Sequence, residues 1–113
     1  MNLLIPILAS LNDNKRNYLL SKILLMNTLI RFWFKFEHSS TLPSAFKLGC
    51  GVTAYSYDDA LILLKQKVFQ RNEEIVIVEC IENIDLTHLD PNHVLPNILP
   101  PNFRGIWYPL GYS

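Results

Sequence analysis

Arg31-Phe32-Trp33-Phe34-Lys35-Phe36-Glu37 is the stretch that decides the fold, because its three phenylalanines alternate with Arg, Trp, Lys and Glu. Successive side chains of a strand point to opposite faces of a sheet, so the phenylalanines share one face. The pattern predicts a half-buried strand. Its phenylalanines should lie in the core, and Trp33 should lie on the other face.

A second strand is predicted from Phe46 to Tyr55, which alternates in the same way and should pair with the first as an antiparallel hairpin. Gly49 and Gly51 fall on its outward face, where a glycine marks the close approach of another group. We expect the indole of Trp33 to lie across these glycines. The alternative is that Gly-x-Gly exposes backbone to a ligand, although the third glycine of a dinucleotide-binding loop is missing.

A helix and a third strand follow in the sequence. The Ser56 hydroxyl can accept an N–H of a first helical turn, and Asp58 and Asp59 place negative charge at the positive end of the helix dipole. We therefore expect a helix from Tyr57, with helix capping rather than catalysis as the role of the carboxylates. The β-branched run over residues 75–81 predicts a strand that is covered on both faces or central in its sheet.

The C-terminal part combines proline with large apolar side chains. Five of the seven prolines stand at or after residue 91, which excludes long regular elements. The abundant aromatic and aliphatic residues exclude a solvated linker, so residues 87–113 should wrap the domain as a strap. The predicted fold class is α+β, with a largely antiparallel three-stranded sheet (β-β-α-β along the chain), one packed helix and the strap.

Residues 27–113 form the predicted single domain, and residues 1–26 form an N-terminal extension. Asn14 could cap a short helix there. An alternative hypothesis is that Met26 is the initiator, so that residues 1–25 do not belong to the protein. The apolar stretches lack the features of a signal peptide and are too interrupted by charges to span a membrane, so we expect a cytoplasmic protein without membrane contact.

The charge and the cysteines narrow the classes of function. The formal net charge is zero, which argues against nucleic-acid binding. The charge is uneven, because residues 1–71 hold nine of the ten basic residues but only four of the ten acidic ones. Cys50 and Cys80 have no further Cys or His at ligand spacing, so we expect reduced thiols, no metal site and no cofactor. A disulfide between them would require neighbouring strands.

Three segments carry distinctive sequence motifs. They are Arg31-Phe32-Trp33-Phe34, then Cys50 to Tyr55 leading into Asp58 to Leu61, and then Pro96-Asn97 with Arg104 to Trp107. Together they resemble a group of short uncharacterised bacterial proteins over about residues 29–112. The resemblance implies a compact bacterial domain. It carries over no catalytic residue, because no activity is established for that group.

Polar groups lie among aromatic ones in the strap, which is the composition of an interaction hot spot. The predicted interaction surface also includes the outward Trp33 and consists of Trp33, His93, Asn97, Arg104, Trp107 and Tyr108. We interpret the chain as a small interaction module of the immunity or regulatory type, with a protein partner and no catalytic residues. The alternative is a small enzyme or ligand-binding domain with His93, Arg104 and Tyr108 around a pocket under the strap.

The histidines of the strap allow two interpretations. His88, Asp90 and His93 could serve as acid, base or metal ligand. Alternatively, Asp90, Pro91 and Asn92 form a turn beside which both histidines are solvated. The second interpretation assigns neither a catalytic nor a metal-binding role to the histidines.

Overall fold

The computed structural model describes residues 9–26, 28–69 and 75–113. Its regular elements are α2 (Asp13–Met26), β1 (Ile30–Phe36), β2 (Cys50–Ala54), α3 (Tyr57–Lys67), β3 (Ile77–Glu82) and β4 (Gly105–Tyr108). Short 3-10 turns occur at Ser44–Phe46 (η1), Leu86–His88 (η2) and Leu95–Asn97 (η3). The α+β class is confirmed, but the sheet has four strands rather than the predicted three because β4 forms within the strap.

The strand order in the described part of the chain is β3-β1-β2-β4, and each neighbouring pair is antiparallel. The predicted β1–β2 hairpin therefore lies at the centre of the sheet. β3 lies at one edge, and all of its residues are at least partly exposed. The prediction that β3 is central or covered on both faces is wrong, because β1 is its only strand neighbour among the described residues.

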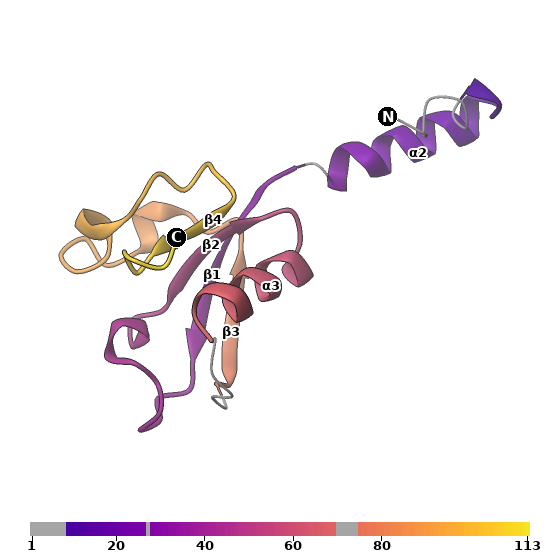
Figure 1. Cartoon of the computed structure of the whole chain (residues 1–113). Helices are drawn as coiled ribbons and strands as arrows, with labels where there is room; N and C mark the ends of the chain where they lie inside the picture. Colours follow the sequence, from indigo (N-terminus) through magenta and orange to yellow (C-terminus); the bar gives the residue numbers. More distant parts are fainter. Residues whose placement is uncertain (1–8, 27, 70–74) are drawn as a thin grey trace.

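One face of the sheet, which we call the helix face, packs against α3 (Figure 1). Phe32, Phe34 and Phe36 are buried there, as the alternation predicted. The start of α3 is also as predicted, since the Ser56 hydroxyl accepts the N–H of Asp59 at 3.1 Å. Strand periodicity and one helix cap thus account for this layer of the fold.

The opposite face, which we call the strap face, is covered by the β3–β4 connection, residues 83–104 (Figure 1). This connection starts at one edge of the sheet and ends at the other. Ile84, Leu89 and Val94 from it are buried against Trp33 and Trp107. Residues 83–104 thus cover one face of the sheet, whereas Gly105–Tyr108 of the predicted strap join the sheet as β4.

The two glycines of the second strand lie under indole rings. A Cβ added to Gly49 would lie 2.5 Å from the Trp33 ring, which confirms that Trp33 packs there. A Cβ added to Gly51 would lie 2.5 Å from the Trp107 ring, so Gly51 is covered by Trp107 instead of Trp33. Packing by aromatic rings, rather than exposure to a ligand, therefore explains both glycines.

The second strand is shorter than the alternation predicted. Phe46 is buried in η1, Leu48 is exposed, and β2 begins only at Cys50. Gly49 has a φ of +130°, a conformation that favours glycine and interrupts regular strand geometry. The turn at Gly49 therefore sets the start of β2.

The strand order also decides whether the cysteines can pair. Cys50 on β2 and Cys80 on β3 both stand opposite Phe34 of β1, one on each side. Strands in a sheet are about 4.8 Å apart, so two strand spacings exceed the roughly 7 Å limit for bridging Cα atoms. Both thiols are free, and burial raises the pKa of each.

The helix α2 stands clear of the sheet (Figure 1). Its N-terminus is capped by Asn12 rather than Asn14, since Asn12 Oδ1 accepts the N–H of Lys15 at 2.8 Å. Tyr18 and Leu20 on it are exposed. No helix in the described ranges is long and apolar enough to cross a membrane. Residues 1–8 of the predicted extension and residue 27 of the predicted domain lie outside the described residues, and a start at Met26 stays a prediction.

Candidate interaction site

Three of the predicted surface residues are core residues. Trp33, Trp107 and Tyr108 retain 3%, 1% and 7% of their exposure, and the Trp33 ring centroid lies 5.8 Å from that of Trp107 and 5.5 Å from that of Tyr108. Burial, followed by the negative charge of Asp90, raises the pKa of Tyr108. Side chains so deeply buried cannot contact a partner directly. The predicted surface must therefore be narrowed to His93, Asn97 and Arg104.

Arg104 is held by a carboxylate of α3. Its Nε and Nη2 donate to the two carboxylate oxygens of Asp59 at 2.9 and 2.6 Å. Asp59 Oδ2 also accepts the N–H of Tyr55 at 3.0 Å. The hydrogen bond from Arg104 is the largest cause that lowers the pKa of Asp59. The pair joins the end of the strap to the first turn of α3, which is a structural role that the sequence did not indicate.

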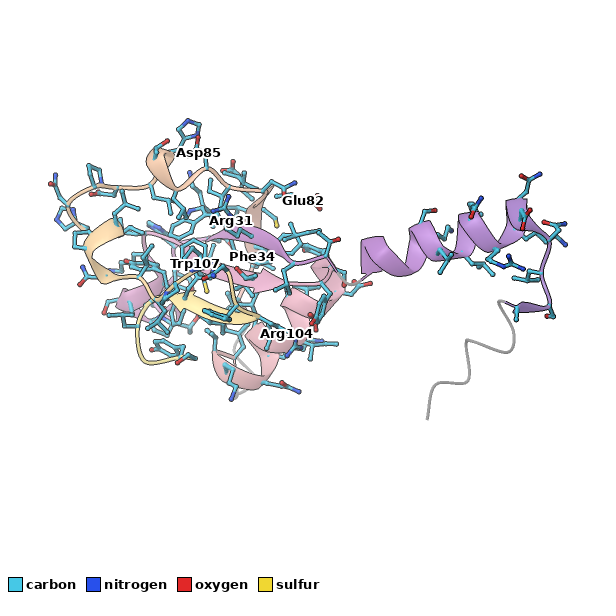
Figure 2. All side chains as sticks on the ribbon, turned by 90° about the horizontal axis from the view of Figure 1, so that it is seen from above. Arg31, Phe34, Glu82, Asp85, Arg104 and Trp107 are labelled. Carbon is cyan, nitrogen blue, oxygen red and sulfur yellow. The ribbon has the colours of Figure 1, made fainter. Side chains whose placement is uncertain are left out.

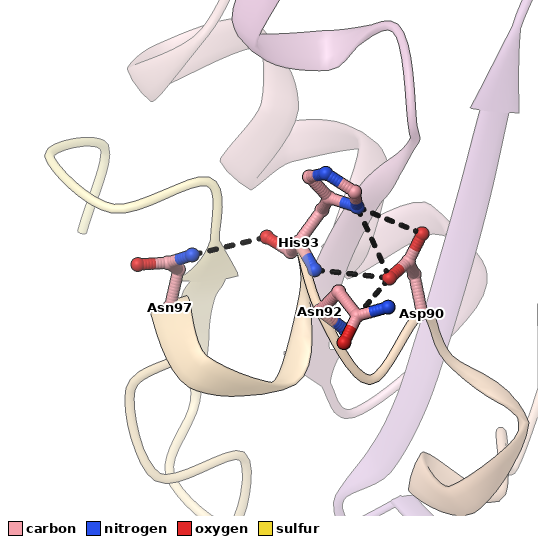
Figure 3. Close-up of polar contacts among 4 residues, drawn as sticks. All are labelled: Asp90, Asn92, His93 and Asn97. Atoms are coloured by element: carbon pink, nitrogen blue, oxygen red, sulfur yellow. Dashed lines mark hydrogen bonds and ion pairs between the residues drawn. The ribbon is translucent and has the colours of Figure 1, made fainter.

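The histidine cluster of the strap is a turn, as the second interpretation predicted (Figure 3). Asp90 Oδ1 accepts the N–H groups of Asn92 and His93 at 2.8 and 2.9 Å, and these bonds are the main causes that lower the pKa of Asp90. His93 Nδ1 lies 3.2 Å from Asp90 Oδ2. Such bonds from a carboxylate to following N–H groups order a turn without need of a ligand.

His93 and Asn97 remain on the outside of the strap, where Asn97 Nδ2 donates to the His93 carbonyl at 3.1 Å (Figure 3). His93, Arg104 and Tyr108, the three residues of the enzyme alternative, make separate contacts with Asp90, Asp59 and Trp33. Among the described residues, no hydrogen bond or ion pair joins any two of these three side chains, although Asp90 interacts with both His93 and Tyr108. General acid–base chemistry needs its groups within hydrogen-bond reach of one substrate atom, and this arrangement does not supply that.

The outer edge of β3 is a surface that the sequence interpretation missed. Val78 of β3 is 61% exposed, and Val76, which immediately precedes β3, is 50% exposed. Glu79 beside them pairs with Lys35 of β1 at 3.6 Å. The run of β-branched residues was a signal for this strand, but it gave the wrong position because it is typical of covered strands.

Comparison with models of known families, with curated proteins and with solved structures found no match. The resemblance to short bacterial proteins therefore stays a prediction. Within the residues that the structure describes, no group of three His, Cys, Asp or Glu side chains could hold a metal ion. The function must be argued from the geometry of the surface.

Proposed function

We propose that this chain is a small cytosolic interaction module of the immunity or regulatory type, and that a partner protein adds an extended strand to the outer edge of β3. The observation that carries the proposal is the mismatch between the sequence of β3 and its position. A strand with the composition of a covered one lies at an edge, with Val76 and Val78 exposed. An added strand would bury these side chains.

The edge of a sheet offers the chemistry for such binding. An edge strand presents a row of N–H and C=O groups without strand partners, and a further strand can pair with them. Full burial of an exposed valine is worth about 1.5–3 kcal/mol, and since Val78 is 61% exposed its burial would contribute about 1–2 kcal/mol, which is roughly a five- to thirtyfold change in affinity. The backbone would supply the pairing and the valines would supply most of the affinity.

The charges along β3 indicate what kind of strand fits. Glu79 is paired with Lys35, whereas Glu82 forms no ion pair with any residue in the described ranges. Opposite charges across two strands stabilise their pairing, and like charges oppose it. A partner strand with apolar residues opposite Val76 and Val78 and a Lys or Arg near Glu82 therefore fits best.

The test uses Val78→Lys, with Ile62→Lys as the matched control on the exposed side of α3. Both substitutions place a lysine at an exposed apolar position, so each should change the free energy of unfolding by only about 0.5 kcal/mol. Tagged wild-type protein and both variants are used to capture partners from the native host. Val78→Lys should capture at least tenfold less partner than the wild type, and Ile62→Lys should capture the same amount as the wild type.

Hydrogen exchange on the purified complex then locates the contact. The amides of residues 77–82 should gain protection when the partner is added, and an extended segment of the partner should gain protection too. Retention of the partner by Val78→Lys, or equal loss with Ile62→Lys, would contradict the proposal. Loss with His93→Ala or Asn97→Ala alone would place the interface on the strap instead.

A ligand-binding domain is the second candidate function. His93, Arg104 and Tyr108 do not support it, because they contact different partners. A separate pocket does support it, since strap residues Pro101 and Asn102 cover one end of the sheet there.

A further inference from the structure

A small pocket lies where the strap meets the N-terminal end of β1. It is lined by Leu29, Arg31, Thr53, Pro101 and Asn102 and has a volume of about 230 Å³. The Thr53 hydroxyl donates to the Pro101 carbonyl, so the strap is fastened to β2 at the wall of the pocket. Thr53 is itself buried. The hydrogen bond from the buried Thr53 thus holds Pro101 in place at the wall of the pocket.

Arg31 supplies the only formal charge in the pocket lining. Arg31 as a residue is partly buried, and among the described residues its guanidinium makes no hydrogen bond or ion pair. Asp85 is an acidic group close enough for the charge of Arg31 to contribute, after the hydrogen bonds from Thr87 and the charge of His88, to the lowering of its pKa. Asp85 is engaged elsewhere, since its Oδ1 accepts the N–H and the hydroxyl of Thr87 at 3.0 and 2.7 Å. Arg31, which is labelled in Figure 2, is therefore a positive charge with free donors at the pocket.

Arg104 provides a contrast within the same molecule. It lies beside α3 with its guanidinium saturated by Asp59, whereas Arg31 projects from β1 without such a partner (Figure 2). A guanidinium matches a carboxylate with two parallel hydrogen bonds, as the Arg104 pair itself demonstrates. Arg31 can make the same kind of pair with a carboxylate that comes from outside the chain.

The walls and the size of the pocket limit the ligand further. Leu29 and Pro101 are apolar, and the exposed amide of Asn102 can donate to a second oxygen. The volume is below the roughly 300–1,000 Å³ of sites for drug-sized molecules. The single guanidinium can balance only one negative charge, and the Asp85 carboxylate nearby repels any further negative charge, so a dianion such as phosphate is disfavoured.

We propose that the pocket around Arg31 binds the carboxylate of a small monoanion with a short apolar body. The proposal deepens the ligand-binding alternative above and does not depend on the β3 edge. The carboxylate could come from a free organic acid or from the C-terminus of a peptide, and the two sources have the same chemistry at Arg31. The guanidinium would hold the carboxylate, and Leu29 and Pro101 would contact the apolar body.

The test is a titration of the full chain with isovalerate, followed by the amide resonances of Thr53 and Asn102 in NMR spectra. Isovaleramide and inorganic phosphate serve as the neutral and dianionic comparisons. We expect saturable shifts with isovalerate and at least tenfold weaker binding of the other two, because a hydrogen-bonded charge pair is worth about tenfold or more. An acetylated dipeptide that ends in leucine tests the peptide source. Tighter binding than isovalerate assigns the site to a C-terminus, and weaker binding assigns it to a free acid.

Variants separate the pocket from other sites. Arg31→Gln should weaken isovalerate binding at least tenfold, whereas Lys35→Gln, which removes the same charge from the same strand outside the pocket, should leave it unchanged. Asn102→Asp places a negative charge at an exposed lining position and should weaken binding even if Arg31→Gln does not fold. Val78→Lys should have no effect on isovalerate, so failure at the β3 edge and failure here are distinguishable. Isovalerate binding that persists in both Arg31→Gln and Asn102→Asp, or no saturable shift in the wild type, would overturn the proposal.

Discussion

The helix face and the strap face are both closed by aromatic side chains, but they draw on different parts of the chain. The helix face combines the β1–β2 hairpin with α3, which follows β2 directly. The strap face brings Trp33 against Trp107, from the two ends of the domain. The helix face is built mainly from elements that are neighbours in the sequence, with Ile106 and Tyr112 as remote additions, whereas the strap face depends mainly on contacts between remote residues. We therefore expect the two faces to respond differently to substitutions of similar size.

The largest effect is expected from truncation of an aromatic side chain on each face. Trp107→Ala and Phe34→Ala should each lower the free energy of unfolding by about 3–5 kcal/mol, because each leaves a large cavity. Only Trp107→Ala should release residues 83–104 to protease under native conditions, since its ring holds that connection against the sheet. Equal native-state cleavage of both variants would show that the two faces are not independent.

Trp107→Phe sharpens this test. The indole Nε1–H of Trp107 is buried without a hydrogen-bond partner among the described residues. Replacement by phenylalanine removes an unpaired buried donor together with part of the ring, and these changes act in opposite directions on stability. Trp107→Phe should therefore cost clearly less than Trp107→Ala in the same denaturant titration.

A medium effect is expected where the backbone of β2 meets the Trp107 ring. Gly51→Ala puts a Cβ at 2.5 Å from that ring and should cost about 1–3 kcal/mol through overpacking. In a Trp107→Ala background the same substitution should cost much less, because the ring that it meets is gone. Four denaturant titrations give this coupling energy. Additive costs would mean that the loss arises within β2 rather than at the strap face.

The smallest effect is expected at the ion pair that links the strap to α3. Asp59→Asn should cost roughly 1 kcal/mol or less at neutral pH, because the Arg104 side chain is partly exposed to solvent. Since the folded pKa of Asp59 is lowered, the pair stabilises the protein above about pH 4 and its contribution is lost as the pH falls through that lowered pKa. Unfolding measured across acidic pH should show the variant and the wild type converging there.

Asp58→Asn is the matched control, because Asp58 lies exposed in the same first turn and no hydrogen bond to Arg104 is observed for it. It should keep the wild-type pH dependence apart from a small dipole effect. A loss with Asp58→Asn equal to that with Asp59→Asn would assign the effect to the helix dipole rather than to the link with the strap.

The parts of the fold that the sequence predicted are those with a local cause. Alternation placed Phe32, Phe34 and Phe36, and a serine followed by two aspartates placed the start of α3. β4 was missed because the three apolar residues between Gly105 and Pro109 are too few to show a strand periodicity. The late start of β2 was missed because the conformation of Gly49 interrupts an alternation that continues through it.

The candidate site was harder to predict because composition does not reveal which side chains are buried. Arg beside Trp and Tyr is typical both of interaction surfaces and of cores with a charged rim. Here Trp107 and Tyr108 belong to the core, and Arg104 belongs to the rim. Periodicity does not encode the order of the strands in the sheet. The edge position of β3 and the position of Arg31 at a pocket could therefore not be predicted from it.

The position of the tryptophans has a practical consequence. Both tryptophans of the chain lie in the cluster on one side of the sheet. Intrinsic fluorescence therefore reports the docking of residues 83–104, whereas far-ultraviolet circular dichroism reports the helices and the sheet as a whole. Contacts between remote residues form slowly, because loop closure must precede them. During refolding, the fluorescence signal should lag behind the dichroism signal. The two tryptophans therefore allow the docking of residues 83–104 to be timed separately from the formation of the helices and the sheet.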